Sequence, residues 1–551
     1  MPNNFTWSHG YQPAQKFSKP VAYFSMEFAI DQALKIYSGG LGYLAGSHMK
    51  SAFELKQNMV GIGMLWQLGY YDQLREQNGY MRAFYQKRTY SFLEDTGIVV
   101  KVDVNGHPVH VKALYLAPEV FQTVPMFFLT TDLPENDFLS RSITERLYHP
   151  NDAARIAQNI VLGIGGSKIL EALNWMPEIY HMNEAHSLPI ACYLYQKYQN
   201  IKDVKRRLVF TTHTPEKAGN SVRSTQLLTE MGFFNGVDIK TARAITGMKG
   251  DSFEYTPAAL RMAKIANGVS KLHGKVSRKM WASYEDICEI TSITNAQNQK
   301  YWQDNSLKNA LDTNNDELLR FRKKELKKEL FKIVADQTGK IFNSNTLTIV
   351  WARRFAAYKR ADLIARDVQR FLALLSNKKY PVQMIWAGKP YPEDHESTAL
   401  FNKMINLSHQ HKNIAVLTGY ELELSASLKK GSDIWLNTPR RPQEASGTSG
   451  MTAAMNASVN VSTDDGWIPE FAVHGENSFI IPAADLNKTI FDQDQHDYDH
   501  LWSLIENTIV PLYYEEPKKW LTIVKNSMKD VLPAFGSNRM AAEYYERLFV
   551  D

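Results

Sequence analysis

Short apolar runs alternate with helical segments along most of this 551-residue chain. The runs lie at residues 21–24, 179–182, 208–212, 347–351, 382–387, 414–417 and 434–436. Runs of this length separated by helices are typical of parallel strands, because the crossover helices cover both faces of the sheet. The pattern therefore predicts an α/β protein built from doubly wound parallel sheets.

Two such sheets are expected, because a chain of this length is too long for one compact core. A charged helical stretch at residues 316–336 leads to the Asn343-Ser344-Asn345 turn, and the second series of strands begins just after it. We expect Rossmann-like domains at residues 1–340 and 341–525, and a final helix at residues 526–551 that packs back on the first domain. Open sheets bind ligands beyond the carboxyl ends of their strands, so the active site is expected there, in the cleft between the domains.

The composition excludes several classes of protein. The 63 basic and 58 acidic residues are mixed along the chain and give a net charge of +5, whereas nucleic-acid binders concentrate their basic residues on one face. The only cysteines, Cys192 and Cys288, form no disulfide framework or metal-ligand pattern, which favours a reducing, cytoplasmic location. The N-terminus has no signal-peptide pattern, and no apolar run is long enough to cross a bilayer. We expect a cytoplasmic protein that binds no nucleic acid, membrane or metal.

Two glycine clusters lie beside or within helical segments. Ser38-Gly39-Gly40-Leu41-Gly42 directly precedes a helix expected at residues 44–55, so its backbone N–H groups could bind an anion with the help of the helix dipole. Taken alone, a tight turn without a ligand is the simpler interpretation. Gly163-Ile164-Gly165-Gly166 lies inside a helical run at residues 152–173 with no strand before it. This second cluster indicates close helix packing rather than a dinucleotide loop.

Four cations, Arg353, Arg354, Lys359 and Arg360, follow the strand at residues 347–351. Arginine binds phosphate through two parallel hydrogen bonds and lysine binds it as a point charge. We expect a helix at residues 359–374, and basic residues at a helix N-terminus oppose its dipole unless an anion is bound there. The cluster therefore favours a phosphate or diphosphate clamp of Arg354 and Lys359 over a solvated basic surface.

Two further loops carry candidate side chains. The run from Glu444 to Met451 follows a strand and leads into a helix, and its small residues leave backbone N–H groups open while Glu444 offers an acceptor for sugar hydroxyls. His213 lies at the carboxyl end of the strand at residues 208–212. That position is as consistent with a structural histidine as with a functional one.

Taken together, the motifs of this chain resemble those of the α-glucan phosphorylases. They are Phe24-Ser25-Met26-Glu27-Phe28, the Ser38–Gly42 loop, the His213 loop, Arg353–Arg360, Gly388-Lys389 and Glu444–Met451. They occur in the order of that family and cover nearly the whole chain. The resemblance implies the GT-B glycosyltransferase fold and the retaining transfer of glucose between an α-1,4-glucan or maltooligosaccharide and inorganic phosphate, which yields glucose 1-phosphate. It is also compatible with a homodimer.

The resemblance implies a role for each matching residue. The residues that would hold the substrate phosphate are Gly40, Leu41, Arg354 and Lys359, with Arg353 and Tyr358 in support. Those that would hold the glucose are His213, Asn295, Glu444, Ser446 and Gly447. The backbone carbonyl of His213 would also face the anomeric carbon, where positive charge develops in the transition state.

One position departs from the family pattern and concerns its cofactor. Relatives have a lysine after the residues that match Gly450 and Met451, and this lysine forms an imine with pyridoxal phosphate, whereas this chain has Thr452. A hydroxyl cannot form an imine, so we expect no covalently bound pyridoxal phosphate. Thr448, which would touch the cofactor phosphate, leaves non-covalent binding open. A second departure is Ala296, where relatives usually have glycine.

Two other functions stay open. Related bacterial glycogen synthases clamp a nucleotide-sugar diphosphate with an Arg and a Lys spaced as Arg354 and Lys359 are, and Thr452 lies where a hydroxyl could bind a ribose. Transfer from ADP-glucose or UDP-glucose is therefore an alternative to transfer to and from phosphate. The third possibility is a catalytically silent glucan-binding or regulatory protein that kept the fold.

Overall fold

The computed structural model describes residues 5–550 and divides the chain into two compact units. The first unit contains the chain up to Tyr71, residues Tyr85–Asn298, and the segment that starts at Ser537. The second unit contains Asp72–Phe84 and Gln299–Gly536. Each unit is built around one large sheet. Within residues 5–550, no helix has both the length and the apolar character needed to cross a bilayer.

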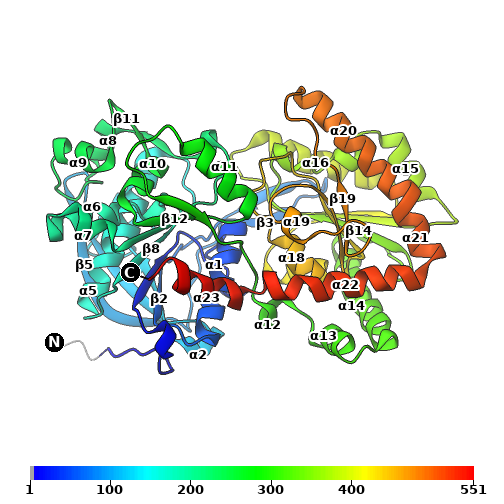
Figure 1. Ribbon diagram of the computed structural model, residues 1–551, viewed down its shortest axis with the longest axis horizontal. Coiled ribbons are helices and arrows are strands. Elements are labelled where there is room, and N and C mark those ends of the chain that lie inside the picture. Colours follow the sequence, from blue (N-terminus) through cyan, green and yellow to red (C-terminus); the bar gives the residue numbers. More distant parts are fainter. Residues whose placement is uncertain (1–4, 551) are drawn as a thin grey trace. The chain divides into compact units, whose positions relative to one another are not determined.

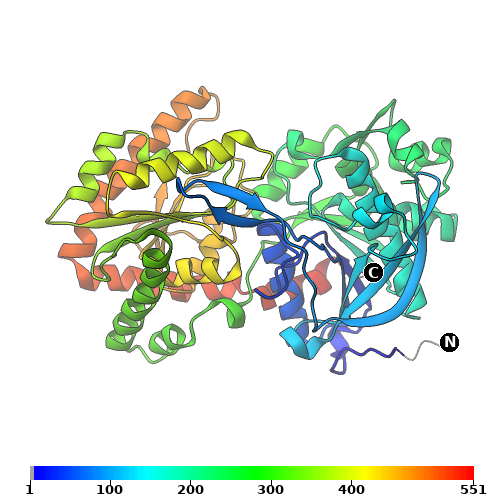
Figure 2. The ribbon, with the colours of Figure 1, turned by 180° about the vertical axis from the view of Figure 1, so that it is seen from behind.

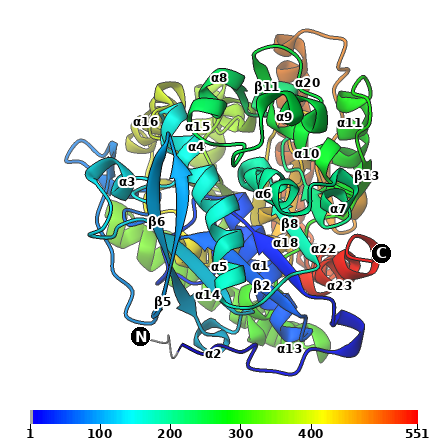
Figure 3. The same cartoon turned by 90° about the vertical axis from the view of Figure 1, so that its left-hand side faces the viewer.

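The sheet of the first unit has nine strands, and most neighbouring pairs are parallel. In spatial order they are β13 (Glu289–Ser292), β12 (Ile265–Gly268), β9 (Leu208–Thr211), β8 (Ile179–Asn183), β1 (Val21–Phe24), β2 (Met59–Met64), β7 (Met126–Thr130), β6 (His107–Leu116) and β5 (Glu94–Val104). The chain runs outward from β1 on one side and from β8 on the other. Figure 3 shows the long antiparallel strands β5 and β6 beside α4 (Asp152–Ile160) and α5 (Gly166–Ala172).

The sheet of the second unit has six parallel strands. In spatial order they are β16 (Ile414–Leu417), β15 (Val382–Ala387), β14 (Leu347–Ala352), β17 (Ile434–Asn437), β18 (Val459–Thr463) and β19 (Ser478–Ile481). Helices α15 (Val368–Ser376) and α16 (His395–His409) lie on one side of this sheet, and α14 (Asp316–Thr338) and α18 (Ser449–Ala454) lie on the other (Figure 1). The expected fold class, two doubly wound Rossmann-like domains, is confirmed.

The remaining helices pack around these sheets or cap their edges. In the first unit they are α1 (Gly40–Glu54), α2 (Pro118–Phe121), α3 (Phe138–Ser142), α6 (Pro189–Tyr198), α7 (Ile201–Lys205), α8 (Thr225–Glu230), α9 (Ile239–Thr246), α10 (Tyr255–Met262), α11 (Lys271–Trp281) and α23 (Ser537–Arg547), together with the small hairpin of β10 (Val222–Ser224) and β11 (Ser252–Glu254). In the second unit they are α12 (Gln299–Trp302), α13 (Asn305–Asp312), α17 (Leu422–Gly431), α19 (Ile468–Phe471), α20 (Ile490–Leu504), α21 (Val510–Glu515) and α22 (Pro517–Phe535).

All the apolar runs picked out in the sequence form buried strands, and the glycine cluster at residues 163–166 lies inside a helix. A Cβ on Gly163 would lie 2.8 Å from the carbonyl oxygen of Ser187, and one on Gly166 would lie 2.7 Å from a methyl carbon of Ile62. The glycines are there because neighbouring backbone and side chains approach the helix closely. The prediction of packing rather than nucleotide binding is confirmed for this cluster.

The expected domain boundary at residue 340/341 differs from the division in the structure, which falls after Asn298. Helix α14 packs against α17, and its residues Leu330, Phe331 and Val334 join the core of the second unit. The helix belongs to that unit because its apolar side is buried there. The chain returns to the first unit at Ser537 rather than at residue 526, because α22 packs against α18 and β18.

The prediction of a helix at residues 359–374 is wrong for the first half of that range. Two short 3-10 turns, Ala357–Lys359 and Leu363–Ala365, follow β14, and the helix α15 begins only at Val368. Arg360 interrupts the helical path because its backbone is left-handed, with φ 50° and ψ 58°. The cations after β14 therefore do not crowd the start of a long helix, and the dipole argument for an anion at this place does not apply.

A hairpin from the N-terminal part of the chain belongs to the second unit. It consists of β3 (Asp72–Arg75) and β4 (Met81–Phe84) and lies beside α16 (Figure 2). The buried amide of Gln73 donates to the carbonyl oxygen of Gly388 at 2.8 Å and accepts from the backbone N–H of Gly419 at 3.0 Å. Gln73 thus satisfies backbone groups of the loops that follow β15 and β16.

Candidate active site

The switch point of the second sheet lies between β14 and β17. The chain runs outward from these two neighbouring strands in opposite directions, and the loops that follow them therefore diverge. Such a point is where open α/β sheets bind ligands. The loop after β14 carries Arg353, Arg354 and Lys359, and the loop after β17 carries Glu444. The structure therefore brings the expected clamp and the expected sugar-binding carboxylate to one place.

Glu444 forms two ion pairs at this switch point. Its Oε2 pairs closely with Nζ of Lys359 and lies 3.3 Å from Nη1 of Arg353. The three side chains are between 7% and 12% exposed. Arg353 also donates from Nη2 to Oγ of Ser449 at 3.2 Å, which links the cations to the start of α18. A buried carboxylate held by two cations has a fixed position from which it can accept hydrogen bonds.

The charges around Glu444 set the ionisation of two carboxyl groups. Burial alone would raise the pKa of Glu444, but the nearby cations Lys359, Arg353 and Arg354 outweigh it and lower the pKa below its ordinary value. The backbone N–H of Glu444 donates to Oδ2 of Asp465 at 2.9 Å. Burial raises the pKa of Asp465 to about 7, and the negative charge of Glu444 adds to this rise. At neutral pH Glu444 is therefore an anion, whereas Asp465 is partly protonated.

Several buried polar atoms around this loop have no hydrogen-bond partner among residues 5–550. They are Nε of Arg353, Oδ1 of Asn437 and Oγ of Ser446. Buried polar atoms are nearly always paired in folded proteins, so each one that is not needs an explanation. A ligand hydroxyl would supply a donor to Oδ1 of Asn437, and hydroxyl or phosphate oxygens would accept from Nε of Arg353 and Oγ of Ser446. The loop therefore has the polar groups of a binding site in addition to its charges.

The other predicted residues of the second unit lie on the same loops. Arg354 is exposed and acts on Glu444 through its charge, whereas the ring of Tyr358 lies 4.9 Å from Nζ of Lys359. Gly447 has φ 86°, a left-handed conformation that favours glycine, and a Cβ there would lie 3.3 Å from Cγ of Glu444. Thr448 precedes α18 as its N-cap. The tight turn at Gly447 thus sets the side chain of Glu444 back toward the cations.

In the first unit, the glycine loop before α1 is held by a buried carboxylate. Glu27 accepts from the backbone N–H groups of Ser38 at 2.6 Å and Gly39 at 3.0 Å, and from the hydroxyl of Tyr148 at 2.6 Å. Burial raises the pKa of Glu27 against the effect of these donors. The helix α1 then begins at Gly40, and Gly40 and Leu41 occupy its first turn. Glu27 accepts from the two backbone N–H groups just before the helix. The N–H groups of the first turn of α1 have no partner within the helix and point along the helix axis.

His213 follows β9, and its surroundings define its tautomer. Nε2 lies 2.7 Å from Oδ1 of Asn183, whose amide nitrogen donates to Oγ of Ser25 at 3.1 Å. Oδ1 of Asn183 can only accept, so Nε2 carries the proton and Nδ1 is the acceptor. Burial lowers the pKa of His213 to about 3. The imidazole is therefore neutral and presents a lone pair at Nδ1.

Glu184 is a residue at this place that the sequence reasoning missed. Its backbone has φ 67° and ψ 166°, a region that L residues rarely adopt, at the carboxyl end of β8. Its partly buried carboxylate pairs closely with the backbone N–H of His213 and accepts from Oγ1 of Thr214 at 3.2 Å. Glu184 thus fixes the backbone of the His213 loop. The rule that singled out His213, a polar residue after a buried strand, applies equally to Asn183 and Glu184.

Asn295 follows β13, away from the β1–β8 switch point in the strand order. Its backbone N–H donates to the carbonyl oxygen of Val269 at 3.0 Å, and its buried Oδ1 has no hydrogen-bond partner among the described residues. The amide is therefore available to a ligand hydroxyl. Within residues 5–550, no group of three or more His, Cys, Asp or Glu side chains is arranged to hold a metal ion.

Two family models match different parts of this chain. A family model described as carbohydrate phosphorylase matches residues 254–498, and one described as starch synthase catalytic domain matches residues 31–275. A maltodextrin phosphorylase of Thermococcus litoralis is 30% identical over 603 residues, which cover 99% of this chain and 72% of that protein. The chain belongs to the carbohydrate phosphorylase family.

Other relatives span a range of similarity. A glycogen phosphorylase of Aquifex aeolicus is 29% identical and is covered over 86% of its length. A protein of Methanocaldococcus jannaschii that is described only as uncharacterized is 47% identical and is covered over its whole length. That match covers 96% of this chain, so nearly the whole sequence is shared with a relative whose name gives no activity.

The residues of the second unit fit the cofactor of carbohydrate phosphorylases only in part. The side chain of Thr452 is fully buried, and its Oγ1 donates to the carbonyl oxygen of Ser449 at 3.0 Å within α18. No amine is present at this position to form an imine, so pyridoxal phosphate does not fit as a covalently attached group here. Arg353, with its unpartnered Nε, and Lys359 are suited to a phosphate group of any origin.

Proposed function

We propose that this protein is a retaining glucosyltransferase that acts on α-1,4-glucans in the manner of a phosphorylase, without covalently bound pyridoxal phosphate. The observation that carries the proposal is the cluster of Arg353, Lys359 and Glu444 at the switch point of the second sheet. It combines cations for a phosphate with a fixed carboxylate for sugar hydroxyls. The similarity to maltodextrin and glycogen phosphorylases supports the same assignment.

In the proposed reaction, the enzyme stabilises charge rather than supplying a nucleophile. In the direction of chain elongation, breaking the bond between the anomeric carbon and the phosphate of glucose 1-phosphate places positive charge on that carbon and negative charge on the phosphate oxygens. The glucan hydroxyl then bonds to the anomeric carbon on the same face, and its proton passes to the released phosphate. Lys359 and the exposed Arg354 stabilise the phosphate, and Glu444 orients the glucose through its hydroxyls. His213 contributes a neutral ring, which does not repel the cationic sugar, and Nδ1 accepts a hydrogen bond from a hydroxyl. The glucan end and glucose 1-phosphate are the two substrates of the reversible reaction.

A second candidate, transfer from ADP-glucose or UDP-glucose, is favoured by one observation. The starch synthase catalytic domain matches residues 31–275, which hold the glycine loop and His213. A nucleotide diphosphate needs the same cations as a phosphate, and Thr452 removes the covalent anchor of the competing cofactor. The cluster in the second unit is compatible with either donor, so the donor must be identified by assay.

A donor panel tests the proposal. Purified protein is incubated with maltooligosaccharide and, in parallel, glucose 1-phosphate with and without added pyridoxal phosphate, ADP-glucose or UDP-glucose. With glucose 1-phosphate we expect the glucan chain to lengthen, and one phosphate to be released for each glucose added. Elongation with a nucleotide sugar alone contradicts the phosphorylase proposal and supports the second candidate. Glucan binding without elongation from any donor supports a silent glucan-binding protein.

The absence of an imine is a separate prediction. Protein incubated with pyridoxal phosphate and reduced with borohydride should yield no pyridoxyl adduct on the peptide that contains Thr452, because the loop offers no amine there. Peptide mass spectrometry checks this. The variant Thr452→Lys, treated identically, is the positive control for detection of that peptide. A stoichiometric adduct on another lysine of the wild-type second unit would contradict the proposal that the cofactor is not held covalently.

A further inference from the structure

Arg360, the residue after Lys359, is anchored by four acceptors. Its guanidinium donates from Nε to the carbonyl oxygen of Thr438 at 2.8 Å and from Nη2 to that of Pro439 at 3.1 Å. It also donates to Oδ1 of Asp494 at 2.8 Å and to Oδ2 of Asp497 at 2.6 Å. The side chain is 4% exposed. Because a non-glycine residue in the left-handed conformation is strained by about 1 kcal/mol, such a conformation persists only where the surroundings hold it.

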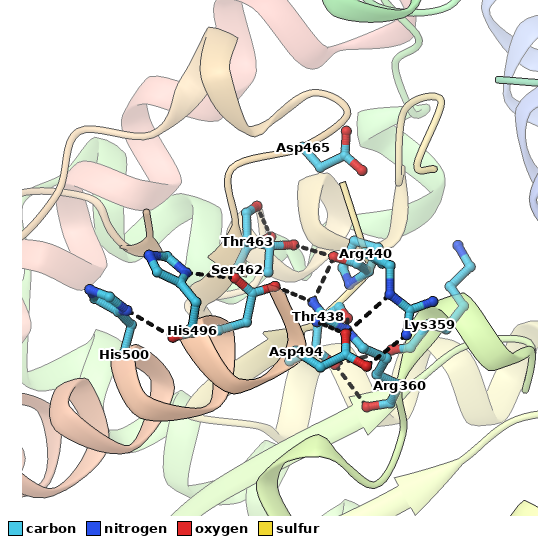
Figure 4. Close-up of polar contacts among 12 residues, drawn as sticks. Lys359, Arg360, Thr438, Arg440, Ser462, Thr463, Asp465, Asp494, His496 and His500 are labelled. Carbon is cyan, nitrogen blue, oxygen red and sulfur yellow. Dashed lines mark hydrogen bonds and ion pairs between the residues drawn. The ribbon is translucent and has the colours of Figure 1, made fainter. Parts of the chain in front are cut away.

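The two carboxylates come from one face of α20. Asp494 and Asp497 are separated by about one helical turn, which brings both side chains to the same side of the helix. Asp494 also accepts from Arg440, at 3.1 Å from Nε and 2.8 Å from Nη2 (Figure 4). The second oxygen of Asp497 lies 3.2 Å from Nδ1 of His496. Helix α20 therefore holds one arginine from each of the two loops at the switch point.

Backbone contacts complete the connection between these loops. The N–H of Arg440 donates to the carbonyl oxygen of Tyr358 at 2.8 Å, and Oγ1 of Thr438 donates to the carbonyl oxygens of Lys359 and Arg360, each at 3.1 Å. Arg440 and Thr438 precede Glu444 on the loop after β17. Hydrogen bonds thus join the turn that carries Lys359 to the loop that carries Glu444. Helix α20 binds to both of them through the ion pairs of its aspartates with Arg360 and Arg440.

The charged side chains of this network pair with one another. Two arginines face two aspartates, and Arg440 and Arg360 lower the pKa of Asp494 against the effect of its burial. The guanidinium of Arg360 points to α20 and not to Glu444, although the ammonium of the preceding Lys359 pairs with Glu444. All three guanidinium nitrogens of Arg360 donate within the network, so Arg360 is not a candidate for substrate contact. Arg360 and Arg440 instead connect α20 to the segments that carry Lys359 and Glu444.

We propose that Asp494 and Asp497 of α20 are positioning residues for glucosyl transfer, which act through Arg360 and Arg440 to hold Lys359 against Glu444. The proposal rests on the proposed function, in which Lys359 binds the phosphate and Glu444 binds the glucose. A displacement of about 1 Å at a reacting group can lower a rate by about 10²-fold. A network that fixes the two loops relative to each other therefore contributes to the rate without touching the substrate.

The test uses the full-length protein and the variants Asp494→Asn and Asp497→Asn, which keep the side-chain volume and remove the charge. The control is Glu506→Gln, which breaks the ion pair of Glu506 with Arg370 just beyond α20. We expect each aspartate variant to lower kcat by about tenfold or more, with the KM for glucan within twofold of wild type. The control should keep both values. Asp494 is the milder change, because it is 23% exposed, so it carries the test if Asp497→Asn does not fold.

Hydrogen–deuterium exchange measures the positioning itself and does not depend on turnover. The peptide that contains Arg440 should exchange at least tenfold faster in the aspartate variants than in wild type or in Glu506→Gln, at a temperature at which all are folded. Unchanged exchange overturns the proposal, as does an unchanged kcat in a variant whose exchange is faster. If wild type turns over no donor, the proposed function fails, and the exchange result alone then supports or overturns the positioning.

Discussion

The variant Lys359→Ala is expected to transfer glucose about 10²–10³-fold more slowly than wild type. The ammonium of Lys359 is buried and pairs with Glu444 at the switch point of the second sheet. It stabilises the negative charge of the leaving phosphate, and charge stabilisation at a site with little water is worth far more than in solution. Initial rates at saturating glucan, with the donor identified by the panel, measure the effect.

Two companion variants separate this role from a general effect of charge. Lys403→Ala removes an exposed lysine that pairs with Asp362 at 2.9 Å on the same unit, and it should keep the wild-type rate. Arg354→Ala removes the exposed cation whose field reaches Glu444, and it should also lower the rate by orders of magnitude. A Lys359→Ala rate within threefold of wild type would show that Lys359 is only a counter-ion of Glu444.

The variant Glu444→Gln should lose both stability and activity. The amide leaves Lys359 and Arg353 without their anion, and removing one partner of a buried ion pair typically costs about 3–5 kcal/mol. The nearby cations hold the pKa of Glu444 below its ordinary value, so its stabilising effect is fully present above the pKa of the unfolded chain and is lost as the pH falls through the lowered pKa of the folded protein. The difference in unfolding free energy between the two proteins should therefore be full at pH 7 and should shrink in acid. Denaturant unfolding at several pH values measures it.

A second buried ion pair provides the matched control. Asp433 precedes β17 and pairs with Lys327, and the two side chains are 6% and 2% exposed. It lies at the amino end of the strand whose carboxyl end leads to Glu444. Asp433→Asn should therefore lower stability by a comparable amount and keep the kcat of the folded protein near that of wild type. If both variants lose activity in proportion to stability, Glu444 has a structural role alone.

The strands and the loops that carry the site could be predicted from the sequence because their signals are local. A buried parallel strand is a short apolar run, and its polar neighbours at the carboxyl end mark a binding edge. This rule selects His213, Lys359 and Glu444 as candidates. The sequence also shows directly that residue 452 is a threonine and has no amine. It does not show that the buried hydroxyl of Thr452 donates to the carbonyl oxygen of Ser449.

The features that were missed depend on residues far apart in the chain. Arg360 interrupts the expected helix because Asp494 and Asp497, more than a hundred residues later, hold its left-handed backbone. The hairpin at residues 72–84 joins the second unit through contacts of Gln73 with Gly388 and Gly419. Glu184 has a rare backbone conformation, and its carboxylate pairs with the backbone of His213, 29 residues later. No local pattern reports such pairings.

The interleaved order of the two units has a consequence for synthesis on the ribosome. The hairpin of the second unit emerges long before the strands that receive it, and α23 of the first unit emerges after the whole second unit. In α23 the hydroxyl of Tyr544 lies 3.3 Å from Oγ1 of Thr211 and 3.1 Å from Nδ2 of Asn267, inside the first unit. The first unit therefore cannot reach its final packing while the nascent chain is still growing. A truncated product without α23 would lack the contacts of Tyr544 with Thr211 and Asn267 and would leave uncovered the side of α1 against which α23 packs.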